Sequence, residues 1–100
     1  MQNFRTLDLA VNFYHQIAGL KLPHHLKDQL LRAASSVALN LAEGRGKSSR
    51  RDQLRYFQIS MGSLRESQTA LRLSGGLDPA LSVMADRIGA SIYLLIKNAN

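Results

Sequence analysis

Residues 29–49 read QLLRAASSVALNLAEGRGKSS and decide the fold of this 100-residue chain. Their apolar side chains recur every three or four residues, which is the period of one face of an α-helix. The repeat begins at Leu26, behind Pro23, a residue that the first turn of a helix tolerates, and it ends at Gly44. The stretch therefore predicts a long amphipathic helix followed by a turn. Its apolar positions are Leu30, Ala33, Ala34, Val37 and Leu41.

Three further segments show the same period on either side of that helix. Residues 4–18 step by three and four and are closed by Gly19, and residues 54–71 lead to Gly75 and Gly76. Residues 81–95 form the last segment. Short connections place consecutive helices antiparallel. The sequence therefore predicts one all-α domain over residues 1–100, an antiparallel up-down-up-down four-helix bundle.

Two of the predicted helices have clear starting signals. Ser49 with Asp52 three residues later resembles a capping box, although aspartate is the weaker partner at that position. Asp78 followed by Pro79 combines a favoured N-cap residue with a proline in the first turn. We therefore expect the third helix to begin after Ser49 and the fourth after Asp78.

The second predicted helix also carries a polar stripe. Steps of three and four residues place its members on one face, and Glu66 of the third helix is expected to join them. If residues 45–48 form the turn of a helical hairpin, the expected cross-helix ion pairs are Arg32–Glu66, Asp28–Arg65 and Glu43 with Arg50 or Arg51. Such pairs fix register more than they add stability. The expected structural polar network is Arg32, Ser36, Asn40, Glu43 and Glu66, with Gln29 extending the stripe.

The last predicted helix is apolar on more than one side. A helix of this kind is usually buried on more than one side, and in a bundle of this size the expected cover is another subunit. The alternative is that the extra apolar residues only widen the internal core. The residues concerned are Ile88, Ala90, Ile92, Tyr93, Leu94, Leu95 and Ile96.

Positive charge is concentrated in the turn between the second and third helices. The chain has a formal net charge of +6, and residues 45–55 hold five basic residues against Asp52 alone. Arginine forks suit bidentate contacts with phosphates, so this cluster is the candidate nucleic-acid-binding site, with Tyr56 as a candidate for stacking on a base. The alternative is a solvated turn whose charge serves only to keep the protein soluble. The five basic residues are Arg45, Lys47, Arg50, Arg51 and Arg55.

Several other classes of site and protein are disfavoured. The chain has no cysteine, which excludes disulfides and thiolate metal sites. We expect no membrane segment, no signal peptide and a cytoplasmic location, because we count no apolar run near the roughly 20 residues of a span. His15, His24 and His25 are expected at the surface rather than on a metal.

Enzymatic activity and a bound cofactor are not expected either. The EGRGKSS run of residues 43–49 lacks the spacing of a phosphate-binding loop. As a general acid/base pair, Glu43 and Glu66 would lie more than about 20 Å apart at about 1.5 Å of rise per residue, beyond the separation of paired catalytic carboxylates.

Residues 29–49, followed by GSLRES at residues 62–67, resemble the four-helix-bundle family of 23S rRNA intervening-sequence proteins. That family includes the accessory variability determinant of diversity-generating retroelements. The motif residues in register are Arg32, Ala33, Ser36, Asn40, Ala42, Glu43 and Gly44, then Gly62, Ser63, Leu64 and Glu66.

The resemblance implies a non-enzymatic protein that forms a ring-like homopentamer with a positively charged surface. It further implies association with RNA or with a complex of a reverse transcriptase and RNA. The first helix departs from the family pattern at Phe13 and Tyr14, where a tryptophan or similar aromatic is usual. A protein-only oligomeric adaptor with an acidic protein partner is the alternative function.

Overall fold

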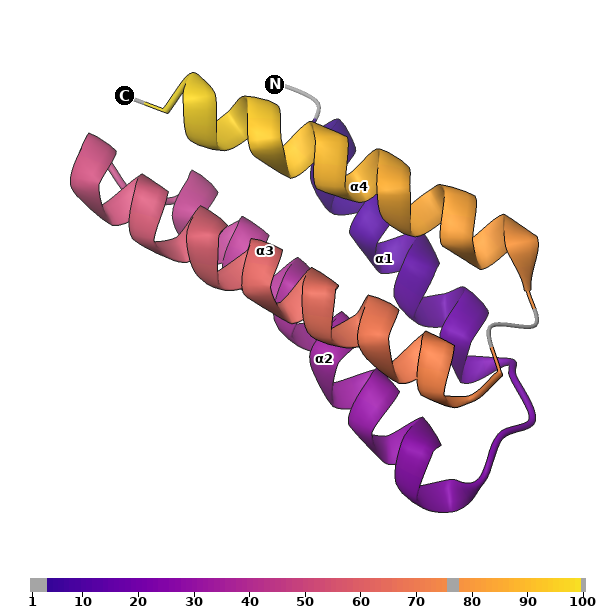
Figure 1. Ribbon diagram of the computed structural model, residues 1–100. Helices are drawn as coiled ribbons and strands as arrows, with labels where there is room; N and C mark the ends of the chain where they lie inside the picture. The colour runs from indigo at the N-terminus through magenta and orange to yellow at the C-terminus, as the bar shows by residue number, and fades with distance from the viewer. Residues whose placement is uncertain (1–3, 76–77, 100) are drawn as a thin grey trace.

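The computed structural model describes residues 4–75 and 78–99, and within these ranges it contains four helices and no strand (Figure 1). The helices are α1 (Arg5–Ala18), α2 (His24–Arg45), α3 (Arg50–Leu73) and α4 (Pro79–Lys97). Each packs against its neighbours in sequence, and α1 also packs against α4. Consecutive helices run in opposite directions over a body of 40 × 21 × 21 Å. The predicted all-α four-helix bundle is confirmed.

The core lies where the apolar faces of all four helices meet. Its largest fully buried side chains come from every helix, as the helical period predicts. Beside this core, the hydroxyl groups of Thr6 and Ser91 are hydrogen-bonded and join the start of α1 to the second half of α4. The largest buried apolar side chains are Phe13, Ile17, Leu30, Val37, Leu41, Leu64, Ile88 and Ile92.

The helix starts agree with the predicted signals. The Ser49 side chain accepts a hydrogen bond from the backbone N–H of Asp52 at 3.2 Å. The Asp78 carboxylate accepts from the N–H groups of Ala80 at 2.9 Å and Leu81 at 3.4 Å. At the other end of α3, Gly75 has a φ of 108°, a left-handed conformation that favours glycine. Gly76, also expected near this end, lies outside the described residues.

Gly44 differs from its expected role as the end of the second helix. It is buried inside α2, which continues to Arg45, and Gly46 occupies the C-cap position. A Cβ on Gly44 would lie 2.7 Å from Cε1 of Phe57 and 3.1 Å from Cβ of Tyr56. Gly44 is therefore explained by the close approach of α3 rather than by termination of the helix.

Helix α4 corrects the expectation that no segment could span a membrane. By length and composition alone, its 19 residues are apolar enough to do so. The core helix of a soluble protein meets the same criterion, and Leu81, Ala85 and Ile88 of α4 are buried in the bundle. The charged residues Asp86 and Arg87 lie exposed in the middle of the helix. Length and composition are therefore weak evidence for a span here.

Candidate nucleic-acid interface

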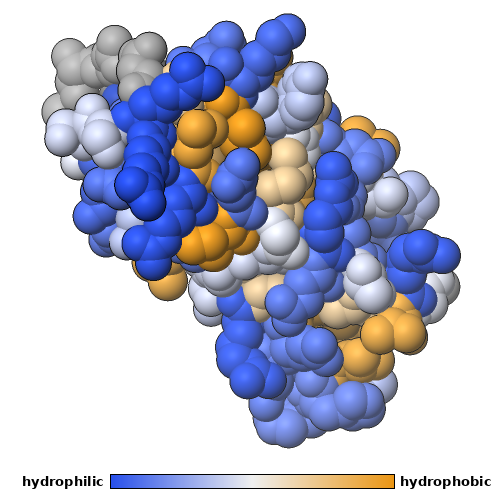
Figure 2. Space-filling model, turned by 60° about the vertical axis from the view of Figure 1, so that its left-hand side comes forward, coloured by the Kyte–Doolittle hydropathy of each residue, from blue (hydrophilic) through white to orange (hydrophobic). Residues whose placement is uncertain are grey.

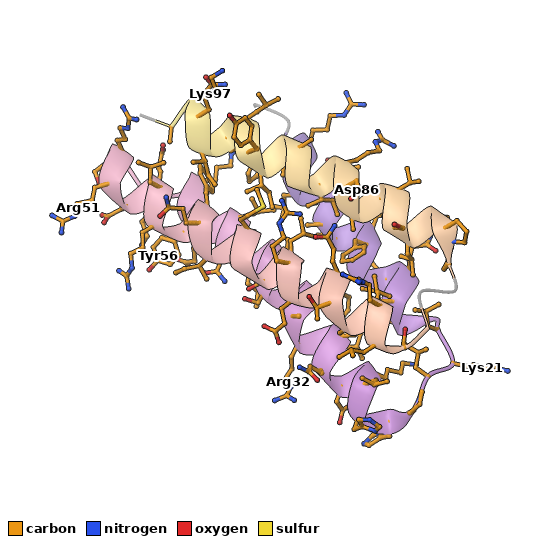
Figure 3. The ribbon with its side chains drawn as sticks, in the orientation of Figure 1. Lys21, Arg32, Arg51, Tyr56, Asp86 and Lys97 are labelled. Atoms are coloured by element: carbon orange, nitrogen blue, oxygen red, sulfur yellow. The ribbon has the colours of Figure 1, made fainter. Side chains whose placement is uncertain are left out.

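The five predicted cations gather at one end of the bundle, which we call the basic pole: Arg45, Lys47, Arg50, Arg51 and Arg55. They come from the end of α2, the turn, and the first two turns of α3. The four arginines are exposed and Lys47 is half-buried. In Figure 3, Arg51 lies at the extreme tip of this end and Tyr56 lies just behind it.

Two further cations lie at the same end, and the sequence analysis missed them. Lys97 closes α4 at this end (Figure 3), and Arg5 opens α1 directly after Phe4, whose ring lies against Arg45 of the basic pole. The signal that could have found them is the topology itself, because the first and last of four alternating helices begin and end beside the middle turn.

Aromatic rings hold three of the basic-pole side chains in place. Lys47 Nζ and Arg55 Cζ lie 5.3 Å and 5.5 Å from the centroid of the Tyr56 ring, within the range of cation–π attraction. Arg45 Cζ lies 4.6 Å from the ring centroid of Phe4. The Tyr56 ring, the candidate for stacking on a base, is thus engaged by two cations of its own chain.

Arg50 and Arg51 differ from the other three cations. Among the described residues, neither forms a side-chain hydrogen bond, an ion pair or a ring contact. Both lie in the first turn of α3, where positive charge opposes the helix dipole. Their guanidinium groups are therefore exposed to solvent at the tip of the basic pole.

Part of the predicted polar network is present along the exposed line where α2 meets α3. Asn40 Nδ2 donates to the backbone oxygen of Ser36 at 2.9 Å and to its Oγ at 3.0 Å. Ser36 Oγ in turn lies 2.7 Å from Ser63 Oγ of α3. The sequence identified Ser63 only as a residue of the family motif. The structure adds it to the polar network through its contact with Ser36.

The predicted ion pairs between α2 and α3 are wrong. Within residues 4–75 and 78–99, the ion pairs found are His24–Asp28 at 3.3 Å and Lys47–Glu43 at 3.4 Å. Arg65 instead donates to Gln68 Oε1 at 2.8 Å. Neither Arg50 nor Arg51 pairs with Glu43, and Asp28–Arg65 and Arg32–Glu66 do not form.

The register of the two helices explains why the pairs expected for Asp28 and Glu43 are absent. Hydrogen bonds join Ser36 to Ser63 and Ser60 to the carbonyl of Val37. This register is shifted by about one helical turn from the one expected from the turn position, which moves Asp28 away from Arg65 and Glu43 away from Arg50 and Arg51. The same shift brings Arg32 level with Glu66. Arg32 and Glu66 still line one groove, but both are exposed and unpaired with each other.

Other site chemistry is sparse in the described part of the chain. His15, His24 and His25 are all exposed, as predicted. Within residues 4–75 and 78–99, no three side chains of His, Cys, Asp or Glu are grouped as metal ligands would be.

The sequence and the fold were compared with those of known proteins. The family model described as 23S rRNA-intervening sequence protein matches residues 4–97. The fold is similar to the crystal structure of a protein with unknown function from the S23 ribosomal protein family of Bacteroides thetaiotaomicron. That likeness has a TM-score of 0.81 at 18% sequence identity and covers 93% of this chain and 99% of the other. A comparison with curated proteins found no match.

Proposed function

The chain belongs to the family of 23S rRNA-intervening sequence proteins, and on that premise we propose that it is a non-enzymatic basic scaffold that binds RNA by charge. We propose that it assembles into a ring-like homo-oligomer, with five subunits as the expected number. In the cytoplasm such a ring would hold RNA, or a complex of a reverse transcriptase and RNA, as in the retroelement branch of the resembled family.

The observation that carries the RNA-binding proposal is the outward pair Arg50 and Arg51 at the basic pole. Cations without partners in their own chain release counterions from phosphates when they bind, so binding is favourable and depends on salt. Phosphate contacts position a nucleic acid and carry no sequence information. With Tyr56 engaged by Lys47 and Arg55, we expect little discrimination between RNA sequences.

Self-association is supported by the apolar side chains that α4 leaves uncovered. Val83, Tyr93 and Leu94 are each more than half exposed. These residues belong to the helix whose two-sided apolar character predicted a covering subunit. Burying them against another chain removes apolar area from water, which is the main driving force for association.

A protein-only adaptor with an acidic partner is the second candidate. The engaged Tyr56 ring favours it, because an RNA-binding surface without a free aromatic lacks the stacking that commonly supports single-strand binding. The same cations would then meet carboxylates of a protein.

The test replaces Arg50 and Arg51 with glutamine and titrates labelled single-stranded RNA at two salt concentrations. We expect binding to fall at least tenfold at low salt, with a shallower salt dependence, because two phosphate contacts are lost per subunit. Circular dichroism should show an unchanged fold, since both side chains are exposed and lack partners among the described residues.

The matched control is Lys21→Gln with Arg72→Gln, which removes the same charge from exposed positions at the opposite end of the bundle. This control should bind as the parent does. Equal losses in the two double variants would point to net charge rather than to the basic pole. A parent without salt-sensitive binding would leave the protein-only adaptor as the better function.

A further inference from the structure

We propose that the exposed face of α4 in one copy docks onto the line between α2 and α3 in a second copy, in a head-to-tail contact. The proposal rests on the self-association proposed above and names the two surfaces that make it. We call them the donor face, on α4, and the receiving seam, on α2 and α3.

The donor face is the side of α4 that its own bundle leaves uncovered. Beyond the five residues that α4 buries, much of this helix faces solvent although its sequence is largely apolar. Figure 2 shows apolar surface framed by hydrophilic residues on one side of the molecule. The donor face comprises Val83, Asp86, Arg87, Ala90, Tyr93, Leu94 and Lys97, all exposed.

The receiving seam combines exposed apolar side chains with an unexplained glycine. Leu39 of α2 is 65% exposed and Ile59 of α3 is 42% exposed. Gly62 lies one turn after Ile59 in the interior of α3, where glycine weakens a helix relative to alanine. A Cβ on Gly62 would meet nothing within 4 Å, whereas one on Gly44 would strike Phe57. The chain's own packing therefore accounts for Gly44 and leaves Gly62 as room for another helix.

Charge complementarity sets the register between α4 and α2. On α2, Arg32 lies two turns before Leu39. On α4, Asp86 lies about two turns before Leu94. A donor α4 laid parallel to α2 therefore brings Asp86 beside Arg32 when Leu94 lies beside Leu39.

The remaining charges agree with the same register. Lys97 follows Leu94 by about one turn, as Glu43 follows Leu39, so Lys97 comes beside Glu43, which also pairs with Lys47 of its own chain. Glu66 lines the same groove as Arg32 and has no ion pair among the described residues. It is thus level with Arg87, the neighbour of Asp86 on the donor face. Arg32 and Glu66, which are exposed and form no ion pair within the described part of their own chain, thus acquire partners from the next. Asp86 also accepts a hydrogen bond from Gln68 of its own chain at 3.3 Å.

The two faces differ, so the contact is heterologous, and repetition of such a contact gives a ring when the rotation closes. Within one bundle α2 and α4 are parallel and lie on opposite corners without mutual contact. A donor α4 parallel to the neighbour's α2 makes all copies point the same way. This arrangement is the one a cyclic ring requires.

The test uses one variant blocked on each face. Leu94→Asp places a charge in the donor face, and Gly62→Gln fills the receiving seam with a side chain that the free chain has space for. By sedimentation, each should remain a single 11.1 kDa chain with parental helicity. An equal mixture should form a dimer and nothing larger, because one intact donor face and one intact seam remain.

The matched control is Val11→Asp, which introduces the same charge at an exposed apolar position of α1 and should keep the parental oligomer. A second pair of variants keeps the test independent of Leu94. Arg32→Glu and Asp86→Arg should each weaken assembly, and the two substitutions combined in one chain should restore it.

Three outcomes would overturn the proposal, and they are distinguishable. If Gly62→Gln assembles as the parent does, the receiving seam is wrong. If the mixture stays at the mass of one chain, head-to-tail docking is wrong, while assembly of the parent still supports the proposed scaffold. A parent that sediments as one chain contradicts the scaffold and the docking together.

Discussion

Gly44 and Gly62 show how one residue type serves two purposes in adjacent helices. Gly44 has the ring of Phe57 within 2.8 Å of the position of a Cβ, and Gly62 has no neighbour within 4 Å of it. The first glycine lets α3 approach α2 inside the chain. Gly62 has no such packing role within its own chain, so we attribute it to the contact with a second copy.

We expect Gly44→Ala to lower the free energy of unfolding by about 1–3 kcal/mol, because the added methyl group must displace the packed Phe57 ring. Gly62→Ala should raise it by about 0.5–1 kcal/mol in the Leu94→Asp background, where the chain is expected to be a monomer. Urea denaturation of both variants measures the difference. Equal effects in the same direction would contradict the contrast between the two sites.

Arg32 gives a second prediction at the scale of a residue. A buried ion pair with Glu66 would have made its loss cost about 3–5 kcal/mol. The structure leaves Arg32 exposed and unpaired with Glu66, so Arg32→Ala should cost less than about 1 kcal/mol in the monomeric Leu94→Asp background. Thermal melts check this value. A large loss of stability there would mean that Arg32 acts within its own bundle.

At the scale of the helices, local signals predicted the elements well. Ser49 and Asp78 form the expected N-caps, because a cap depends on residues within one turn. The register between α2 and α3 was not predictable from the turn. It is set by Ser36, Ser60 and Ser63 at the contact between the helices, and the length of a turn does not encode that packing.

Capping also gives a prediction for α4. Asp78→Ala should lower the free energy of unfolding by about 1 kcal/mol, because it removes the acceptor for the N–H groups of Ala80 and Leu81. Asp78→Asn keeps a side-chain oxygen and should retain most of the parental stability. Chemical denaturation of the two variants separates them. Identical losses would show that the charge, rather than the hydrogen bonds, stabilises this helix start.

The candidate site was predictable in part for a similar reason. The five cations of the basic pole are close in sequence, so composition alone located them. Lys97 and Arg5 join them only through the antiparallel topology. The engagement of Tyr56 by Lys47 and Arg55 depends on side-chain geometry, which spacing does not determine.

For the whole molecule, parallel copies in a ring would place all basic poles on one rim. When several basic poles are held on one rim, binding of an RNA to one pole raises the effective concentration of that RNA at the others. Leu94→Asp keeps every cation of the pole, yet we expect it to bind a long single-stranded RNA at least tenfold more weakly than the parent. Titration at one fixed salt concentration measures this. Val11→Asp should bind as the parent does, and equal affinities of Leu94→Asp and the parent would show that single chains suffice.

The antiparallel arrangement also brings the end of α4 to the basic pole (Figure 1), and Phe4, just before α1, lies against Arg45 of that pole. A fluorophore or affinity tag fused at either of these points would crowd the surface proposed for RNA. The link between α1 and α2, at residues 19–23, lies at the far end of the bundle. A circular permutant that joins α4 to α1 and opens the chain in this link would carry its tag there, away from the charged end and from both docking surfaces.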